Sequence, residues 1–405
     1  MNILFLSELF FPHGGGAELA TYEYAKLLSE NGVNVIVVTN KFSSEPSFFK
    51  NQKLVIYRLP LMKGSSTVKY QILFNFNVVF SNFFRKLFAW ADVVYIPRCW
   101  FSAIPVAKAY GKPVVVHLHD YILVCPLAST YDLSKSAICQ LRHCSKRCIY
   151  TFEKGYGRGL ESSLVSILLN STVGLQLHRL ITLSDAVICV SHAQKNIILN
   201  KIPTLRDKTW VIYNPLPESS FTKIEGDDYG FFGGSNPAKG FDVLYRALKR
   251  ITANFYVKLH VTKFALSHSE PELLNHAEII FHGKLSPVSL NNLYKQIRAV
   301  CFPSIWPEPL PYVVSEALLR GRIVIASDIG GVPELTDGCK GAFLFETGNY
   351  DKLAEKIEYA DGLSREAAID LATQGREAFT QKFSNEITLT RFIEVCYRII
   401  EEKEC

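Results

Sequence analysis

The order of apolar runs and glycines at the start of the chain constrains its fold most. Residues 3–6 form a short apolar run typical of a buried strand, and the loop after it contains three consecutive glycines, residues 14–16. An amphipathic helical pattern and a second apolar run, residues 33–38, follow. A strand, a helix and another strand in this order form a βαβ unit, which implies a parallel, doubly wound sheet with right-handed crossovers.

The three glycines lie between the first strand and the helix, at the carboxyl end of the predicted sheet. Ligands bind at this end of doubly wound sheets, and glycine allows the backbone to approach a phosphate or a sugar closely. A flexible connection is the alternative interpretation, because a run of glycines alone is weak evidence.

The chain has 405 residues, which favours two domains. Apolar runs alternate with helical patterns in both halves, so we predict an α/β fold throughout. The sequence Asn-Pro-Leu-Pro at 214–217 and the polar run after it mark a boundary. We expect a first domain at 1–214, a linker at 215–228, a second domain at 229–383 and a final helical segment at 384–405.

Two glutamates, Glu308 and Glu316, flank a predicted helix start in the second half of the chain. Pro309 and Pro311 place Glu308 on a constrained turn, and apolar residues recur at helical spacing from Tyr312 onward. A helix N-terminus offers unpaired N–H groups and a partial positive charge, which suit a diphosphate. The alternative is that both glutamates are surface acids favoured by the helix dipole.

A second glycine loop lies at the start of the second domain. After the apolar run 229–232 come Gly233, Gly234 and Ser235, and Lys239 precedes the next helical pattern. Small residues leave room for a diphosphate, and Lys239 would supply a point charge to a leaving group.

The stretch 306–334 resembles the signature of retaining, nucleotide-sugar-dependent glycosyltransferases of family 4, which have the GT-B fold. The resemblance rests on the two glutamates, the apolar run 323–326 and a Gly-Gly-x-Pro-Glu turn. It extends over nearly the whole chain. It implies two Rossmann-like domains facing a central cleft, with the last helix packing back on the first domain. The other matching residues are Pro12, Gly15, Gly16, Glu18, Lys239, Gly240, Gly330, Gly331, Pro333 and Glu334.

The resemblance also implies roles for the matched positions. Glu308 would contact the transferred sugar and Glu316 the nucleotide ribose. His119, which follows the apolar run 114–117, would face the sugar or the acceptor, although a histidine there is often only a packing or capping residue. The implied catalytic residues are Glu308, Lys239 and His119. The implied donor-binding residues are Gly15, Gly16, Gly234, Ser235, Lys239, Lys284, Leu285, Leu310, Pro311, Tyr312 and Glu316.

Two residues depart from the family pattern. Gly234 stands where the family usually has an arginine, which removes a bidentate phosphate contact. Pro311 stands where the family usually has a glycine that donates its backbone N–H, and proline has no N–H to donate. Both departures bear on the affinity for the diphosphate more than on the type of reaction.

The resemblance implies transfer of a hexose from a UDP-sugar or GDP-sugar to a hydroxyl of a glycan or lipid-linked acceptor, with retention and without a required cofactor. One alternative is a nucleotide-sugar epimerase with a GT-B-like fold, which needs no acceptor. The other is a non-catalytic protein that binds sugar nucleotides. The missing arginine favours the second alternative, whereas Lys239, Glu308 and Glu316 argue against it.

Four cysteines, Cys125, Cys139, Cys144 and Cys148, cluster within a basic segment of the first domain, an insertion at about 121–160. Clustered cysteines in a cytosolic chain favour a metal site, so a structural zinc is one interpretation, with His143 as a substitute ligand. The spacing differs from the paired C-x-x-C of common zinc ribbons. Buried free thiols or a disulfide are the alternatives.

The net charge of 44 − 38 = +6 is mild for a nucleic-acid binder, so we expect no nucleic-acid partner. The basic residues of 135–158 and the aromatic residues Phe80, Phe84 and Phe88 suggest peripheral binding to an anionic membrane. Core packing is the alternative for the aromatic residues. No signal peptide or membrane span is apparent, so we expect a cytoplasmic protein that binds the inner face of the cell membrane.

Overall fold

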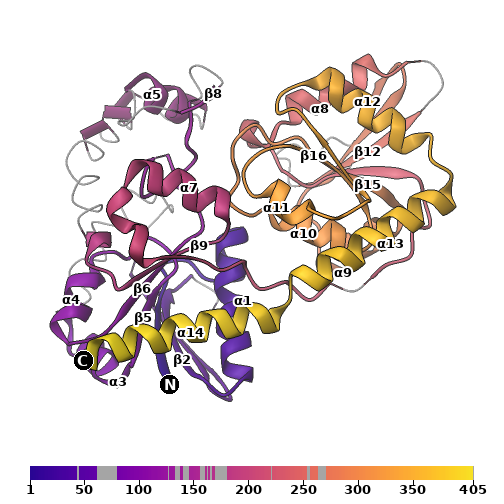
Figure 1. Cartoon of the computed structure of the whole chain (residues 1–405). Coiled ribbons are helices and arrows are strands. Elements are labelled where there is room, and N and C mark those ends of the chain that lie inside the picture. The colour runs from indigo at the N-terminus through magenta and orange to yellow at the C-terminus, as the bar shows by residue number, and fades with distance from the viewer. Residues whose placement is uncertain are drawn as a thin grey trace. The chain divides into compact units, whose positions relative to one another are not determined.

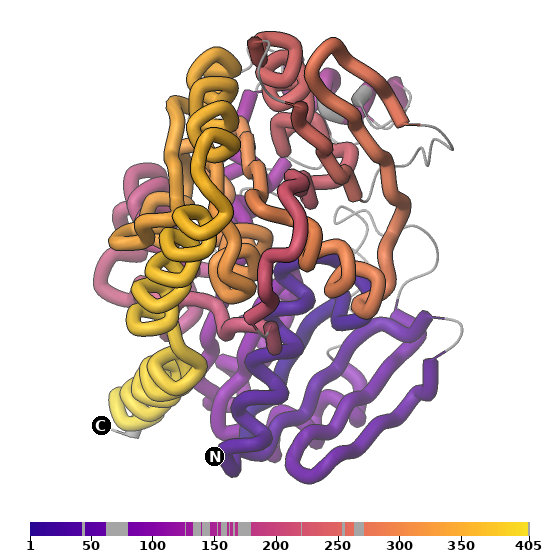
Figure 2. The backbone as a smooth tube through the Cα atoms, turned by 90° about the vertical axis from the view of Figure 1, so that its right-hand side faces the viewer, coloured from indigo at the N-terminus to yellow at the C-terminus, as the bar shows by residue number. Residues whose placement is uncertain are grey.

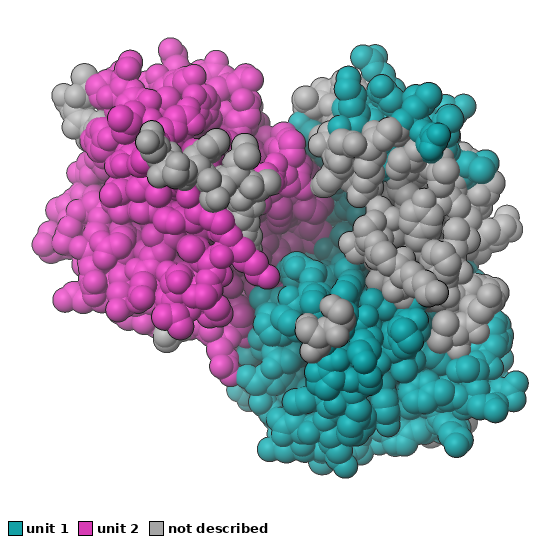
Figure 3. Space-filling model, turned by 180° about the vertical axis from the view of Figure 1, so that it is seen from behind, with its two compact units in different colours: residues 1–215, 385–405 teal, residues 216–384 magenta. Residues whose placement is uncertain are grey.

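The computed structural model describes residues 1–42, 45–61, 80–125, 127–132, 137–139, 146–155, 160–161, 163–164, 167–168, 180–219, 221–252, 256–262 and 271–404. The chain divides into two compact units, which Figure 3 colours separately. Unit 1 comprises Met1–Pro215 and Asn385–Cys405, and unit 2 comprises Leu216–Ser384. The division after Pro215 falls at the start of the expected linker.

Unit 1 is built on an eight-stranded sheet. Its strands are β1 (Asn2–Leu6), β2 (Asn34–Asn40), β3 (Phe48–Asn51), β4 (Leu54–Leu59), β5 (Val93–Ile96), β6 (Val114–Leu118), β9 (Ala186–Cys189) and β10 (Thr209–Val211). Their order across the sheet is β10-β9-β6-β5-β1-β2-β4-β3. The edge strand β3 pairs antiparallel with β4, and the other pairs are parallel. Because β1, β5 and β6 are neighbours, the loops after their carboxyl ends lie close together.

The helices of unit 1 are α1 (Gly16–Glu30), α3 (Asn82–Trp90), α4 (Ala103–Ala109), α5 (Lys146–Gly155), α7 (His192–Lys201), the 3-10 helix η2 (Pro203–Lys208) and α14 (Asn385–Glu404). A small hairpin joins β7 (Tyr131–Asp132) to β8 (Ala137–Ile138) inside the expected insertion. Helices α1, α3, α4 and α7 contact the strands of the eight-stranded sheet, whereas α5 lies beside β8 and away from it (Figure 1).

The C-terminal helix α14 lies against α1 in unit 1 (Figure 2). The Phe392 ring is fully buried, 5.2 Å from that of Tyr24, and Val395 and Ile399 extend the same apolar face. Burying one such side chain stabilises a fold by about 1.5–3 kcal/mol. The Thr388 hydroxyl donates to the Tyr213 carbonyl at 3.2 Å and so holds the start of α14 to the end of the last strand of the sheet.

Unit 2 is built on a seven-stranded sheet in the order β13-β14-β12-β11-β15-β16-β17. Only β13 pairs antiparallel among the described strands of this sheet. The strands are β11 (Asp228–Phe231), β12 (Val257–Val261), β13 (Glu272–Leu274), β14 (Ala277–Phe281), β15 (Ile297–Phe302), β16 (Ile323–Ser327) and β17 (Ala342–Phe345). The helices are η3 (Pro237–Lys239), α8 (Phe241–Arg250), α9 (Pro287–Gln296), α10 (Tyr312–Leu319), α11 (Val332–Thr336), α12 (Tyr350–Asp361) and α13 (Arg365–Lys382).

The predicted parallel strands are present in both sheets, with ends that differ by one or two residues. The sequence did not predict the antiparallel edge strands β3 and β13. All four residues of β3 are exposed, and β13 has no buried residue, so neither shows the apolar run by which a buried strand is recognised.

Candidate active site

The turn after β11 in unit 2 ends in Lys239. The Asn236 side chain accepts a hydrogen bond from the Ala238 N–H at 3.0 Å and so starts the single turn of η3. Gly240 then adopts φ +80°, and a Cβ there would lie 1.7 Å from the carbonyl oxygen of Pro303. Only glycine therefore allows the start of α8 to contact the loop after β15, which brings Lys239 to that loop.

Glu308 lies in the loop after β15 and forms an ion pair with Lys239. The Lys239 ammonium donates to Glu308 Oε1. The Trp306 indole N–H donates to the same oxygen at 3.2 Å, and the Ser304 hydroxyl lies 3.5 Å from it. The Glu308 side chain is only 10% exposed. A cation and an anion thus lie side by side at the carboxyl ends of two adjacent strands, β11 and β15.

The Gly-Gly turn before α11 holds the backbone that carries Glu308. Gly330 has φ +60°, and a Cβ on it would lie 2.3 Å from the Glu308 carbonyl oxygen. A Cβ on Gly331 would lie 2.0 Å from the Pro309 carbonyl oxygen. The Gly331 N–H donates to the Glu308 carbonyl at 2.9 Å. These glycines therefore allow two loops to touch, and their contact positions Glu308.

Glu316 is half-buried on α10, which begins directly after Pro311. Pro311 occupies the N-cap position without a side-chain cap, and its carbonyl accepts from the N–H groups of Val314 and Ser315 at 3.2 and 3.4 Å. The two glutamates thus lie on either side of the start of α10, as the proline and helix pattern predicted.

The remaining predicted donor-binding residues of unit 2 lie on nearby loops. Ser235 and Lys284 are exposed, Leu285, Leu310 and Tyr312 are half-buried, and Gly234 is buried with φ +71°. The loop of Lys284 and Leu285 follows β14, so it leaves the sheet at the same edge as the Lys239 turn. Contact of these residues with a nucleotide stays a prediction.

In unit 1, His119 lines a small pocket at the carboxyl ends of β5 and β6. Its ring stacks on that of His117 with the ring centres 4.3 Å apart. The Tyr95 hydroxyl bonds to His117 Nδ1 at 2.7 Å and so orients the second ring. Among the described residues, neither ring nitrogen of His119 has a hydrogen-bond partner, although the ring is buried. Arg98 and Asp120 also line this pocket.

The surroundings of His119 keep its imidazole neutral. Burial, and to a lesser extent the charge of Arg98, lower the pKa of His119 to about 3. A neutral imidazole can donate one hydrogen bond and accept another, but it cannot provide a positive charge to a diphosphate. The His119 ring therefore suits an uncharged polar group such as a hydroxyl.

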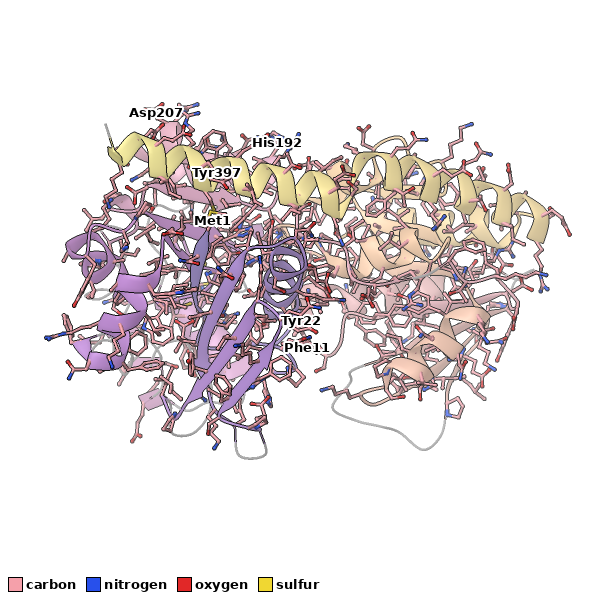
Figure 4. All side chains as sticks on the ribbon, turned by 90° about the horizontal axis from the view of Figure 1, so that it is seen from below. Met1, Phe11, Tyr22, His192, Asp207 and Tyr397 are labelled. Carbon is pink, nitrogen blue, oxygen red and sulfur yellow. The ribbon has the colours of Figure 1, made fainter. Side chains whose placement is uncertain are left out.

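The glycine turn at 14–16 connects to the same pocket through residues that the sequence analysis did not single out. The Glu18 carboxylate bonds the Gly15 N–H at 2.6 Å and forms an ion pair with Arg98. From the sequence, Glu18 was named only as a residue that matches the family pattern, and Arg98 was not named. The available signal was the position of Arg98 two residues after an apolar run, at the carboxyl end of a parallel strand. In the loop before the turn, Phe11 packs on Tyr22 with the rings 5.0 Å apart (Figure 4).

The clustered cysteines give no metal cage in the described part of unit 1. Cys125 and Cys148 are buried, Cys139 is half-buried, and Cys144 and His143 lie outside the described residues. No group of three or more His, Cys, Asp or Glu side chains that could hold a metal ion occurs among the residues described. Burial raises the pKa of the Cys125 thiol. The zinc site stays a prediction.

The aromatic side chains of α3 divide between core and surface. Phe84 and Phe88 are fully buried, so they belong to the core and cannot contact a lipid surface. Phe80, which precedes α3, is 55% exposed, and Arg85 and Lys86 of α3 are also exposed. In the ranges that the structure describes, no helix combines the length and apolar character required to cross a membrane.

Comparison with known proteins agrees with the architecture of the two units. A glycosyltransferase of Methanocaldococcus jannaschii, itself uncharacterized, is 32% identical over 237 residues, which cover 56% of this chain and 64% of the relative. Sucrose-phosphate synthase from Thermosynechococcus elongatus has a TM-score of 0.72 at 14% identity, covering 99% of each chain. Anabaena HepE, solved with UDP and glucose, has a TM-score of 0.66 at 19% identity, covering 97% of this chain and 98% of HepE. These likenesses confirm the predicted GT-B fold.

Two family profiles cover most of the sequence. The profile of Glycosyltransferase Family 4 matches residues 14–219, and that of Glycosyl transferases group 1 matches residues 226–360. The first profile alone covers more than half of the chain, and it includes the glycine turn and the His119 pocket. The second includes Lys239, Glu308 and Glu316. The chain therefore belongs to glycosyltransferase family 4 and is a glycosyltransferase.

Proposed function

We propose that this glycosyltransferase moves a hexose from a UDP-sugar or GDP-sugar to a hydroxyl of a glycan or lipid-linked acceptor, with retention at the anomeric carbon. The observation that carries this proposal is the Lys239–Glu308 pair, which the glycines at 240, 330 and 331 hold in place. HepE, a structural neighbour, was solved with UDP and glucose, which supports a sugar nucleotide as the donor.

The pair provides complementary partners for the two parts of such a donor. Lys239 would contact the diphosphate, whose negative charge grows as the bond to the sugar breaks. Glu308 would accept hydrogen bonds from hydroxyls of the sugar. In the absence of the donor each side chain satisfies the other, so neither charge is left unpaired in a partly buried site. Donor binding then exchanges one ion pair for two polar contacts.

In the proposed reaction, the bond between the anomeric carbon and the phosphate oxygen breaks, and its electron pair leaves with the diphosphate. The acceptor oxygen bonds to the same face of the anomeric carbon, and its proton passes to the departing phosphate oxygen. The protein contributes positioning and charge stabilisation. His119 would donate or accept a hydrogen bond to a hydroxyl, because its imidazole stays neutral.

In this proposal Ser235 and Lys239 compensate for the two departures from the family pattern. Gly234 lacks the arginine side chain, so the exposed Ser235 beside it would supply a hydrogen bond to the diphosphate instead. Pro311 has no N–H, so the diphosphate would depend more on Lys239. We therefore expect the diphosphate affinity to be more sensitive to Lys239 than in relatives that keep the arginine.

A donor screen tests the proposal directly. Purified protein would be incubated with UDP-sugars and GDP-sugars, with and without acceptor glycans, and the released nucleotide and the anomeric configuration of the product would be followed. We expect nucleotide release that depends on Lys239, with Lys239→Met lowering kcat about 100- to 1,000-fold. Inversion at the anomeric carbon, or equal turnover by the variant, would contradict the proposal. An epimerase would change the sugar without any acceptor.

We further propose that the protein acts in the cytoplasm, at the inner face of the cell membrane, where a lipid-linked acceptor lies. The exposed Phe80 with Arg85 and Lys86 is the described surface that supports this. Flotation with anionic and neutral vesicles tests it. We expect binding to anionic vesicles that weakens with salt, because exposed charges are screened over about 10 Å at 0.1 M ionic strength. Equal, negligible binding to both vesicle types would refute it.

The four clustered cysteines form a separate proposal, a structural zinc that plays no part in catalysis. Elemental analysis of the purified protein should then show roughly one zinc per chain. Metal-free protein with four titratable thiols would exclude the site. This result would leave the proposed transfer reaction untouched, because no step uses a metal.

A further inference from the structure

The glycine turn of unit 1 is closed by a side chain. The Gly15 N–H donates to Glu18 Oε2 at 2.6 Å. Gly14 has φ +97°, and a Cβ on it would lie 2.4 Å from Glu18 Cδ. The carboxylate therefore occupies the space that a side chain at Gly14 would need. The shape of the turn depends on Glu18 folding back over it.

Arg98 holds the other oxygen of this carboxylate, Glu18 Oε1. Arg98 follows β5 and Glu18 lies in the first turn of α1, after β1. These strands are neighbours, with Phe5 opposite Tyr95. The Arg98 and Glu18 side chains are only 14% and 3% exposed, so water screens the pair weakly. The ion pair thus links the glycine turn to the loop that lines the His119 pocket.

Two further carboxylates face Arg98. Burial lowers the pKa of the guanidinium, but the charges of Glu18, Asp120 and Glu8 outweigh burial, and the net pKa is raised. Arg98 is therefore charged at every accessible pH. Glu8 follows β1 and Asp120 follows β6, and Glu8 Oε2 also accepts from the Cys99 N–H at 3.3 Å. Two contacts thereby join the loops after β1 and β5, and Asp120 of the loop after β6 lines the same pocket as Arg98.

We propose that Arg98 is a positioning residue for sugar transfer, acting through Glu18 to hold the turn at 14–16 in the shape that receives the donor. This inference rests on the proposed function, in which Gly15 and Gly16 contact the donor. Arg98 need not touch the donor itself. A misplacement of about 1 Å in such a turn can cost roughly 100-fold in rate, so a residue that fixes the turn controls the reaction.

A purely structural ion pair would behave differently. Its loss would lower the free energy of unfolding without changing the turn or the catalytic constants of the folded protein. Unit 1 contains a matched control, the ion pair of Lys108 and Asp185 at 2.5 Å, in which Asp185 also accepts from the Val114 N–H at 2.7 Å. Lys108→Met breaks a partly buried ion pair of the same sheet without touching the glycine turn.

The first readout is amide hydrogen exchange in the ligand-free protein, which needs no substrate. In Arg98→Met and Glu18→Gln we expect a peptide covering residues 11–18 to exchange about tenfold faster, because the turn loses a charged contact. Arg98→Lys should restore part of the protection. Lys108→Met should leave this peptide unchanged. Unchanged exchange in Glu18→Gln and Arg98→Lys, the two mildest changes, would overturn the proposal even if Arg98→Met failed to fold.

The second readout is a double-mutant cycle on turnover of UDP-glucose, or of whichever sugar nucleotide the wild type consumes. Arg98→Met and Glu18→Gln should each lower kcat about ten- to a hundredfold, and the double variant should be no worse than the worse single variant, because both act through one contact. Multiplying effects, or an equal loss in Lys108→Met, would contradict the inference. If the wild type consumes no sugar nucleotide, the proposed function fails. The hydrogen-exchange experiment still tests whether Arg98 and Glu18 hold the glycine turn.

Discussion

The two units present carboxylates to their ligand sites in opposite ways. In unit 2, Glu308 has one cationic partner, Lys239, and two neutral donors. In unit 1, Glu8, Glu18 and Asp120 share one cation, Arg98. In a matched pair such as Lys239 and Glu308, both side chains stay charged and each can contact a ligand. In the cluster of unit 1, burial raises the pKa of Glu8 to about 7, although the charge of Arg98 opposes the shift.

The difference suggests different roles: the Lys239–Glu308 pair of unit 2 would act on the donor, whereas the Glu18–Arg98 pair of unit 1 would fix the backbone. The charges of Lys239 and Glu308 in unit 2 are balanced and lie next to each other, so in the proposed function a donor would divide them between its diphosphate and its sugar. In unit 1 the buried Glu18–Arg98 pair joins the loops after β1 and β5, so it fixes the backbone beside the His119 pocket. The comparison predicts that substitutions of Lys239 and Glu308 change catalysis directly, whereas those of Glu8, Glu18 and Arg98 act through structure and pH.

The largest expected effect on stability lies at the glycine turn of unit 2. Gly330→Ala should destabilise the protein by at least about 3 kcal/mol, since its Cβ would lie 2.3 Å from the Glu308 carbonyl oxygen at a left-handed backbone position. Gly348 is the matched control: it has φ +79°, but a Cβ on it would meet no atom within 4 Å, so Gly348→Ala should cost only about 1 kcal/mol. Urea unfolding of both variants measures the difference. Equal costs would show that the contact with the Glu308 loop is unimportant.

A smaller effect is expected from Glu8 in unit 1, and it depends on pH. In the folded protein burial raises the pKa of Glu8 from 4.5 to about 7. Between these values the folded state keeps a proton that the unfolded state has lost, so the contribution of Glu8 to stability falls as pH rises from 4.5 to 7. Glu8→Gln keeps the neutral form at every pH. Its stability relative to wild type should therefore rise across this window, by at most about 3 kcal/mol.

Unfolding of the two proteins at pH 5 and pH 8 checks this prediction. A stability difference that is the same at both values would show that Glu8 is not a raised-pKa carboxyl. A difference that falls with pH would show that Arg98 stabilises an ionised Glu8, and the contrast between the two units would then disappear.

The sequence predicted the α/β fold of unit 2 and the placement of Glu308 and Glu316 on either side of the start of α10, because both depend on local patterns. Apolar runs followed by glycine mark buried parallel strands and their carboxyl-end loops, and Lys239, Glu308 and Glu316 stand in recognisable motifs. Gly330 and Glu308, whose loops touch, both belong to the stretch 306–334 that carries the family signature. The antiparallel edge strands β3 and β13 were missed because they lack buried apolar residues.

The network of unit 1 could not be predicted in the same way. Glu8, Arg98 and Asp120 are far apart in the sequence, and each alone resembles an ordinary polar residue after a strand. Their association follows from the order of β1, β5 and β6 across the sheet, which the sequence does not encode locally. The helical spacing of Phe80, Phe84 and Phe88 predicted one face, but it could not show that Phe84 and Phe88 are buried while Phe80 is exposed.

The proposed site in unit 2 gives its two glutamates different roles. Steady-state kinetics of Glu308→Gln and Glu316→Gln with varied donor concentration test these roles most directly. Glu308 would act on the sugar as its bond breaks, so Glu308→Gln should lower kcat strongly with little change in donor KM. Glu316 would bond the ribose equally before and during the reaction, so Glu316→Gln should raise donor KM about ten- to a hundredfold with a smaller effect on kcat. Melting temperatures near that of the wild type would show that both variants are folded. Full activity in both would contradict the proposed transferase site.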